Sequence, residues 1–180
     1  MGELNPTAAS LLGFLHEGDF SGYDLVKVAE QLIGDFWSLT QSQVYRELTA
    51  LAGRGLVEAG ETGARSKRPY RITDAGRAAF RAWIVEPPAN EQIRYPLLLT
   101  LCFGGHLPVE QLLEFIGDQR RVHELRLKKY RATLEEMPVR AYPHQYATLR
   151  FGLRYEQAVL DWMAELPEIL QQPDLPEASA

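Results

Sequence analysis

The segment from Ser38 to Thr73 constrains the fold more than any other part of the chain, because it predicts a short helix followed at once by a β-hairpin. Thr40 and Gln43 have the spacing of a capping box, in which two side chains three residues apart close a helix N-terminus. Three apolar residues then recur at i, i+4 and i+7: Val44, Leu48 and Leu51. This spacing puts them on one face, so the helix is expected to pack through that face and expose the other.

The exposed face of this predicted helix is polar near its N-terminus. With about 100° between successive residues, the side chains outside the apolar stripe are Ser42, Gln43, Tyr45 and Arg46. Hydroxyl, amide and guanidinium groups are the ones that hydrogen-bond to base edges and phosphates. The helix therefore suits the major groove of a DNA duplex.

The hairpin that follows is basic. Residues 56–59 predict a short strand, and Gly60 and Gly63 mark the turn. Four basic residues and no acidic residue occur between positions 65 and 71: Arg65, Lys67, Arg68 and Arg71. Pro69 lacks an N–H, so the return strand is predicted to lie at the edge of its sheet. Either feature alone would fit ordinary packing or a solvated loop, but a helix followed by a cationic hairpin favours DNA binding.

Three further helices are predicted in the first half of the chain. Asn5 and Pro6 form a cap followed by a proline at the first helical position, Ser21 begins a second helix, and Thr73 begins another after the hairpin. The order of helices and strands is that of a winged helix-turn-helix. We therefore predict a mainly α fold with a small β-wing, in which residues 1–86 form a winged helix-turn-helix DNA-binding domain and residues 87–180 form a helical region.

Several segments resemble the PadR family of bacterial transcriptional regulators. The resemblance rests on residues 10–17 (SLLGFLHE), 21–25 (SGYDL), 36–37 (FW), 42–48 (SQVYREL), 55–58 (GLVE) and 70–77 (YRITDAGR). It covers the first half of the chain, and the second half resembles more loosely the long helical C-terminal region of the larger PadR subfamily. The resemblance implies a homodimeric winged-helix repressor that a small aromatic or lipophilic effector releases from DNA.

The resemblance also indicates which residues contact DNA. The positions that match the family's DNA-contacting segments are Ser21, Tyr23, Ser42, Gln43, Tyr45, Arg46, Lys67 and Arg68. Thr40 and Arg65 complete the predicted DNA-binding set. The alternative is a winged-helix module for protein–protein assembly without specific DNA binding. Such a module would lack polar outward residues on its third helix, and this chain has them.

Residues 87–180 predict a dimerisation and effector-sensing domain made of helices. The apolar run 95–103 (YPLLLTLCF) is expected to be buried on several sides. Pro108 and Pro143 open two long helices, and Pro167 is expected to end or kink the second. Their apolar seams are predicted to pair with a second copy of the chain, through Leu112, Ile116, Leu127, Leu149, Leu153, Leu160 and Met163. Two recognition helices related by a two-fold axis would read a pseudo-palindromic operator, with half-sites roughly 34–36 Å apart or a multiple of that distance.

Charge and composition set limits on this hypothesis. The net charge is −5, and residues 1–86 hold nine Lys and Arg against eleven Asp and Glu. Because the whole chain does not attract DNA, binding must depend on where individual cations lie. No apolar run is long enough for a membrane helix, no secretory leader precedes Asn5, and a single cysteine fits a reducing compartment. We therefore expect a cytoplasmic protein that does not bind membranes.

The chain shows no pattern typical of an enzyme. Its four histidines stand in no His-x-x-x-His spacing, and its one cysteine forms no Cys-x-x-Cys pair, so we predict no metal, no cofactor and no catalytic residue. Cys102 lies in an apolar run and is interpreted as an inert core thiol rather than a nucleophile.

An effector site is predicted near the boundary of the two halves, where aromatic and imidazole side chains gather in the sequence. The candidates are Trp83, Tyr95, His106, Tyr142 and His144. The alternative is a core at the junction whose polar tips reach solvent.

Overall fold

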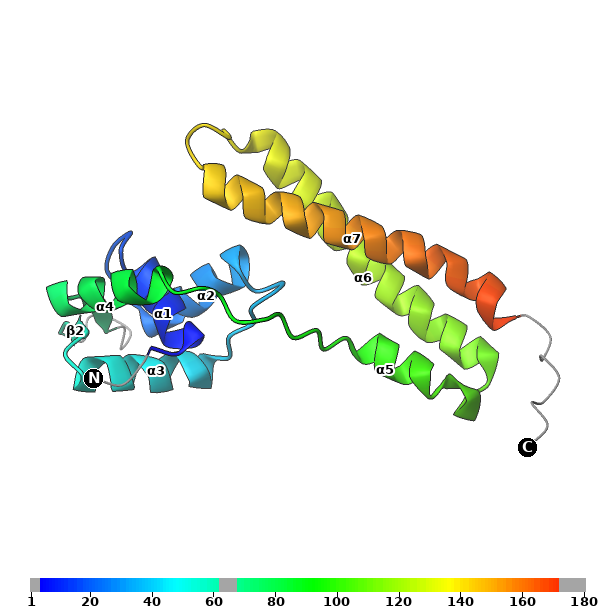
Figure 1. Cartoon of the computed structure of the whole chain (residues 1–180), viewed down its shortest axis with the longest axis horizontal. Coiled ribbons are helices and arrows are strands. Elements are labelled where there is room, and N and C mark those ends of the chain that lie inside the picture. Colours follow the sequence, from blue (N-terminus) through cyan, green and yellow to red (C-terminus); the bar gives the residue numbers. More distant parts are fainter. Residues whose placement is uncertain (1–3, 62–67, 172–180) are drawn as a thin grey trace. The chain divides into compact units, whose positions relative to one another are not determined.

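The computed structural model describes residues 4–61 and 68–171. The chain divides into two compact units, Met1–Glu91 and Gln92–Ala180, and each is described by itself. Within these described residues, the first unit contains four α-helices and a small sheet, and the second contains three α-helices and a 3₁₀ turn (Figure 1). The structure is therefore mainly helical with a small β component.

The first unit is built on four helices with side-chain caps. They are α1 (Pro6–Phe14), α2 (Gly22–Leu32), α3 (Gln41–Gly53) and α4 (Asp74–Ile84). Asn5, Ser21, Thr40 and Thr73 each accept a hydrogen bond from a backbone N–H in the first turn of the helix that follows. These are the four starts that the capping residues predicted, and they are confirmed.

The core of the first unit lies between α1, α2 and α3. The side chains of Leu11, Leu12 and Leu25 are fully buried beside the apolar stripe of α3, whose members Val44, Leu48 and Leu51 are at most 1% exposed. Gly55, with φ of +69°, ends the turn after α3 and directs the chain into the sheet. The predicted amphipathic orientation of α3 is therefore confirmed.

The sheet corrects one prediction. Its strands are β1 (Phe20–Ser21), β2 (Val57–Ala59) and β3 (Pro69–Ile72), in the order β1-β3-β2. β3 is the central strand and pairs antiparallel with both neighbours, so the prediction of an edge strand was wrong. Pro69 is tolerated because it is the first residue of the strand and contributes its carbonyl, which accepts from the Gly60 N–H at 2.8 Å. The two-residue β1 has no pattern that the sequence could show.

The second unit is a long helical hairpin with a short helix beside it. Here α6 (Val109–Glu136) and α7 (Pro143–Leu170) run antiparallel, and α5 (Pro96–Cys102) is joined to α6 through the 3₁₀ turn η2 (Gly104–His106). The helix α7 continues through Pro167 to Leu170, so this proline does not end it. A small core forms around Leu97, Ile116 and Met163.

Residues 95–103 are not buried on several sides, contrary to the prediction. Leu97 is 5% exposed, whereas Leu98, Leu99 and Phe103 are 46%, 65% and 61% exposed. Cys102 is also exposed, so it is not a core thiol. The helix α5 has seven residues and is covered on one face within a single chain, and its other faces meet solvent.

None of the helices in the part of the chain that the structure describes is both long and apolar enough to cross a membrane.

Candidate nucleic-acid interface

The exposed face of α3 carries the side chains expected to read DNA. Ser42, Tyr45 and Arg46 are exposed, Gln43 is half-buried, and Val44 between them is fully buried. The helix is thus held from behind by the core while its polar side faces outward. Such a helix is both rigid and accessible, as insertion into a groove requires.

The N-terminus of α3 is closed by a complete capping box. The Thr40 hydroxyl accepts a hydrogen bond from the Gln43 N–H at 3.2 Å. Gln43 Oε1 in turn accepts from the Thr40 N–H at 2.8 Å and from the Thr40 hydroxyl at 3.0 Å. Because the hydroxyl of Thr40 both donates and accepts within the cap, Thr40 acts here as a helix cap rather than as an open hydrogen-bonding group.

Arg46 is oriented by a chain of polar contacts that begins at α1. Asn5 donates from Nδ2 to Glu47 Oε2 at 3.1 Å, and Arg46 Nη2 lies 3.3 Å from Glu47 Oε1. The Arg46 side chain is 70% exposed and that of Glu47 is 11% exposed. The buried carboxylate therefore steers a guanidinium that remains open to a ligand.

Tyr45 joins α3 to the start of α2. A Cβ added at Gly22 would lie 2.6 Å from Tyr45 Cε1, so the ring rests directly on the glycine backbone. Thr49 donates from its hydroxyl to the Tyr45 carbonyl at 2.9 Å. Only a glycine at position 22 permits this approach, which places Tyr45 against the first turn of α2.

The two predicted contacts at the start of α2 differ in accessibility. Ser21 is buried, and its hydroxyl donates to Asp24 Oδ2 at 2.6 Å while it accepts from the Asp24 N–H. Tyr23 is exposed, and Lys27 Nζ lies 4.7 Å from the centre of its ring. Hydrogen bonding to Tyr23 raises the pKa of Lys27. Tyr23 and Lys27 are therefore both accessible at the start of this helix, and Ser21 is its cap.

The basic residues of the hairpin have different surroundings. Arg68 is exposed and donates from Nε to the Gly60 carbonyl at 3.0 Å across the hairpin. Arg71 holds Asp19, with Nη2 2.6 Å from Asp19 Oδ2, and this hydrogen bond lowers the pKa of Asp19. Arg65 and Lys67 lie outside the described residues. Arg71 therefore ties β3 to the segment before β1, which the sequence did not indicate.

The second unit buries most of the predicted dimer residues within one chain. Leu112, Ile116, Leu127, Leu160 and Met163 are at most 8% exposed, and Leu149 and Leu153 are half-buried. The seams predicted from the sequence therefore join α6 to α7 in a single subunit. The exposed apolar side chains of this unit lie elsewhere and include Leu98, Leu99, Phe103, Leu125 and Phe151.

The five predicted effector residues are not gathered in one place. His106 precedes α6 and Tyr142 and His144 follow it, so 28 residues of helix, about 40 Å at 1.5 Å per residue, separate them. Trp83 packs in the core of the first unit. The near-heptad spacing predicted two long helices. It did not reveal that His106 would lie at one end of α6 and Tyr142 and His144 at the other.

Tyr95 belongs to a polar cluster that the sequence did not reveal. Its hydroxyl lies 3.0 Å from His123 Nε2, and His123 Nδ1 is hydrogen-bonded to Glu156 Oε2. His123 and Glu156 are 3% and 2% exposed. Burial raises the pKa of Tyr95 to about 12. The cluster connects the start of α5 with both long helices.

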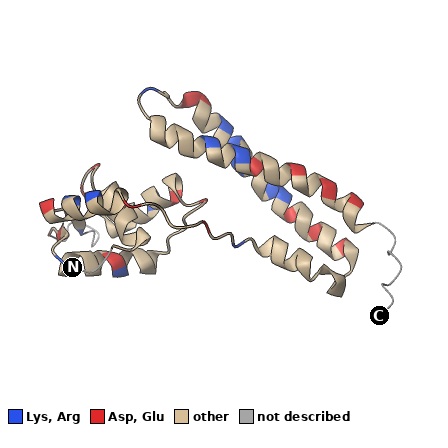
Figure 2. Cartoon of the chain, viewed as in Figure 1, with Lys and Arg blue, Asp and Glu red and all other residues tan. Residues whose placement is uncertain are grey.

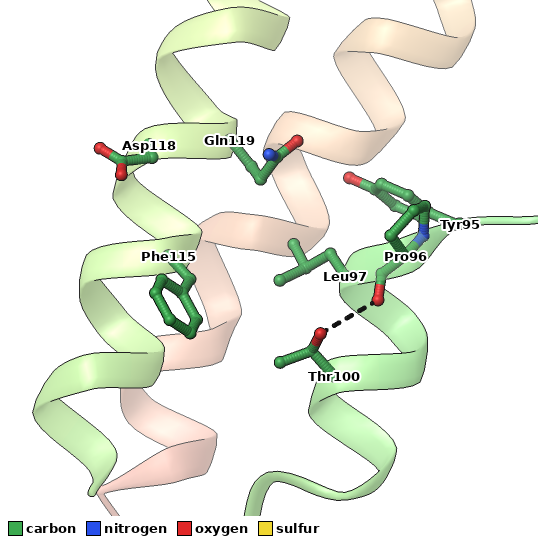
Figure 3. Close-up of a pocket in the computed structure, with 7 residues that line it drawn as sticks. All are labelled: Tyr95, Pro96, Leu97, Thr100, Phe115, Asp118 and Gln119. Carbon is green, nitrogen blue, oxygen red and sulfur yellow. Dashed lines mark hydrogen bonds between the residues drawn. The ribbon is translucent and has the colours of Figure 1, made fainter. Parts of the chain in front are cut away.

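A hollow of about 260 Å³ lies beside this cluster, between α5 and α6 (Figure 3). Its lining combines apolar, aromatic and polar side chains. The residues that line it are Tyr95, Pro96, Leu97, Thr100, Phe115, Asp118 and Gln119. Of the five effector candidates, Tyr95 alone lines this hollow.

The arrangement of the first unit defines a class of protein: a helical bundle with an exposed polar third helix, followed by a β-hairpin wing. Residues 11–82 match the family model described as "Transcriptional regulator PadR-like family". Residues 93–171 match the family model described as "Virulence activator alpha C-term". The chain belongs to the PadR-like family of transcriptional regulators, and it is therefore not an enzyme.

Relatives and solved structures agree with this assignment over nearly the whole chain. The chain is 30% identical to the probable transcriptional regulator Rv1176c of Mycobacterium tuberculosis, covering 91% of this chain and 96% of that protein. It is 25% identical to the negative transcriptional regulator PadR of Bacillus subtilis, covering 87% and 93%. The structure of B. subtilis PadR in complex with operator DNA shares the fold, with a TM-score of 0.78 at 23% identity, covering 94% and 100%. The Vibrio cholerae virulence activator AphA matches with a TM-score of 0.68 at 26% identity, covering 91% and 98%.

Proposed function

We propose that this regulator is a cytoplasmic homodimeric repressor that binds a specific DNA sequence and is released by a small-molecule effector. The observation that carries the proposal is the outward polar face of α3, on which Ser42, Tyr45 and Arg46 are exposed above a fully buried stripe. A transcriptional regulator needs such a face to distinguish base pairs. The solved B. subtilis PadR complex with operator DNA supports the same role for this chain.

Specific contacts must supply most of the binding free energy. The chain carries a net charge of −5, and Lys and Arg are interspersed with Asp and Glu in the first unit (Figure 2). Few phosphates are therefore neutralised per subunit, which keeps non-specific binding weak. Arg46 is assigned to a base edge, and Arg68 to a phosphate beside the wing.

We assign dimerisation to the second unit, through side chains that are exposed in one chain. Leu99 in α5, Phe103 directly after α5 and Phe151 in α7 are each more than 60% exposed. Pairing two copies through such faces would remove this apolar surface from water. It would also set the separation of two α3 helices and so the spacing of a pseudo-palindromic operator.

We assign the effector to the hollow between α5 and α6. Phe115 and Leu97 offer apolar contacts, and the side-chain amide of Gln119 offers a hydrogen-bonding partner for a hydroxyl group. A small aromatic compound with a hydroxyl group fits this combination. The solved complex of B. subtilis PadR with p-coumaric acid supports an aromatic ligand for this fold.

The proposed function is tested by selecting binding sites from random duplexes and by measuring affinity for the DNA upstream of the chain's own gene across a salt series. Arg46→Ala is expected to weaken binding to the selected site by about 1–3 kcal/mol. Arg68→Ala is expected to weaken binding to all duplexes similarly. It should also reduce the slope of log affinity against log salt concentration by about 0.9 for each lost phosphate contact. Failure of the wild-type chain to enrich any duplex would instead favour the protein–protein assembly module.

A further inference from the structure

The capping box of α3 fixes which end of the Gln43 amide is held by Thr40. Its Oε1 receives two hydrogen bonds from Thr40, one from the backbone N–H at 2.8 Å and one from the hydroxyl at 3.0 Å. A backbone N–H can only donate, so the atom that faces it must be the amide oxygen. Two donors occupy the two acceptor positions of that oxygen.

The amide nitrogen of Gln43 is left as the available group. Within residues 4–61 and 68–171, no hydrogen bond engages Gln43 Nε2. Gln43 is half-buried and stands between exposed Ser42 and the exposed pair Tyr45 and Arg46. Gln43 therefore belongs to the α3 face proposed to enter the major groove, and neither N–H of its amide is used within the described part of the chain.

We propose that Gln43 reads DNA as a donor only and selects guanine at one position of each half-site. This inference rests on the proposed function, because it concerns the α3 face that would contact the operator. Guanine presents two neighbouring acceptors in the major groove, N7 and O6, which suit the two N–H donors of the amide. Cytosine presents its N4 donor there, which meets the amide donors unfavourably.

The same argument excludes the usual pairing of glutamine with adenine. That pairing is bidentate: the amide donates to adenine N7 and accepts from adenine N6. Gln43 Oε1 is already occupied by Thr40. Turning the amide to accept from N6 would break the two hydrogen bonds from Thr40 that close the N-terminus of α3. Contact with guanine leaves both of these hydrogen bonds intact.

The test combines base substitutions in the selected operator with two variants at position 43. Gln43→Ala removes the donors. Gln43→Glu keeps an oxygen that accepts from Thr40 but replaces the donors with an acceptor. Gln41→Ala is the matched control, since Gln41 is exposed in the same turn and has no part in the cap. Melting temperatures of all variants show whether α3 remains folded.

We expect a guanine at one half-site position whose change to adenine weakens wild-type and Gln41→Ala binding about tenfold. The same change should alter Gln43→Ala binding less than twofold. Gln43→Glu should melt like the wild type and enrich cytosine at that position, because a carboxylate accepts from cytosine N4.

Two results would overturn the inference while leaving the proposed function intact: adenine at the position that depends on Gln43, or base changes that affect wild type and Gln43→Ala equally. If the wild-type chain enriches no duplex, the proposed function fails and the inference fails with it.

Discussion

In the first unit, each of the four α-helices begins at a side chain that accepts a hydrogen bond from the helix, whereas α5, α6 and α7 of the second unit have no such cap. The two units also differ in their cores. Among the described residues, the largest fully buried side chains belong to the first unit, with Met163 as the exception. In the first unit, side chains of the unit itself therefore cap the helix N-termini and fill the core.

The second unit is organised differently, around a buried polar pair and exposed apolar faces. His123 and Glu156 are buried and hydrogen-bonded to each other at the centre of the hairpin. Leu99, Leu125 and Phe151 are exposed on its surface. In the proposed function the first unit reads DNA and must hold its shape alone, whereas the second joins two subunits and must leave apolar surface for its partner. The contrast suggests that the first unit is stable by itself and that the second depends on assembly.

The largest expected effect is on the core of the first unit. Leu48→Ala removes a fully buried side chain of α3 and should lower the free energy of unfolding by about 2–5 kcal/mol, through lost burial and the cavity left behind. Chemical denaturation followed by circular dichroism measures this change. Leu32→Ala, at a position that is 57% exposed in the same unit, should change stability by about 0.5 kcal/mol or less. Equal effects of the two variants would show that the first unit has no dominant core.

A comparable loss is expected when the polar centre of the second unit is broken. Glu156→Ala removes the hydrogen-bond partner of Nδ1 of buried His123 and should cost about 3 kcal/mol. Glu156→Gln should cost less, because the amide oxygen still accepts a hydrogen bond from His123. Calorimetry of the three proteins measures the difference. A Glu156→Ala protein as stable as the wild type would mean that apolar packing alone holds the hairpin.

The assembly of the second unit is tested on α5. Leu99 is 65% exposed in the single chain, so Leu99→Glu should leave the subunit folded but weaken dimerisation by tenfold or more, about 1.4 kcal/mol. Sedimentation across a concentration series measures the dissociation constant, and circular dichroism reports the fold. An unchanged dissociation constant would assign the dimer interface to another face.

A smaller effect is expected where Tyr45 rests on Gly22. Gly22→Ala places a Cβ 2.6 Å from the Tyr45 ring and should displace it, at a cost of about 1 kcal/mol in stability and a loss of DNA affinity. Gly53→Ala is the control, because nothing lies within 4 Å of a Cβ there. It should be neutral or stabilising by about 0.5 kcal/mol. If both variants bind DNA equally well, Tyr45 does not need its present position.

The smallest effect is the pH dependence of the ion pair between Asp19 and Arg71. Hydrogen bonding to Arg71 lowers the pKa of Asp19 from its ordinary value of 3.8. Folding is therefore favoured by this pair above pH 3.8, and the benefit is lost as pH falls through the lower folded-state pKa. The melting temperature of the wild type should exceed that of Asp19→Asn slightly at pH 7, and the difference should disappear in acid. A difference that persists at pH 2 would have another origin.

Local signals in the first unit predicted its helices well. The caps at Asn5, Ser21, Thr40 and Thr73 depend on hydrogen bonds that span three residues, so they are visible in the sequence. The inward and outward faces of α3 likewise depend on helical periodicity. The same reasoning failed at Pro69, because the place of a strand in its sheet depends on β1, which is far away in the chain and only two residues long.

In the second unit, periodicity identified two long helices but not their partners. An apolar seam has the same spacing whether it packs on a helix of its own chain or on one from a second copy. Leu112, Ile116, Leu127, Leu160 and Met163 were predicted at a dimer interface and are buried within one subunit. The polar cluster of Tyr95, His123 and Glu156 joins three helices, and no spacing in the sequence indicates it.

The sequence by itself determined where helices begin, which face of α3 is apolar and which family the chain resembles, because these properties depend on neighbours within a few residues. Only the tertiary structure decided that β3 is central, that Arg71 holds Asp19 and that Ser21 is buried. It also decided the orientation of Gln43 on the segment from Ser38 to Thr73. The physical reason is that burial, strand order and the occupancy of each donor and acceptor depend on groups brought together by folding.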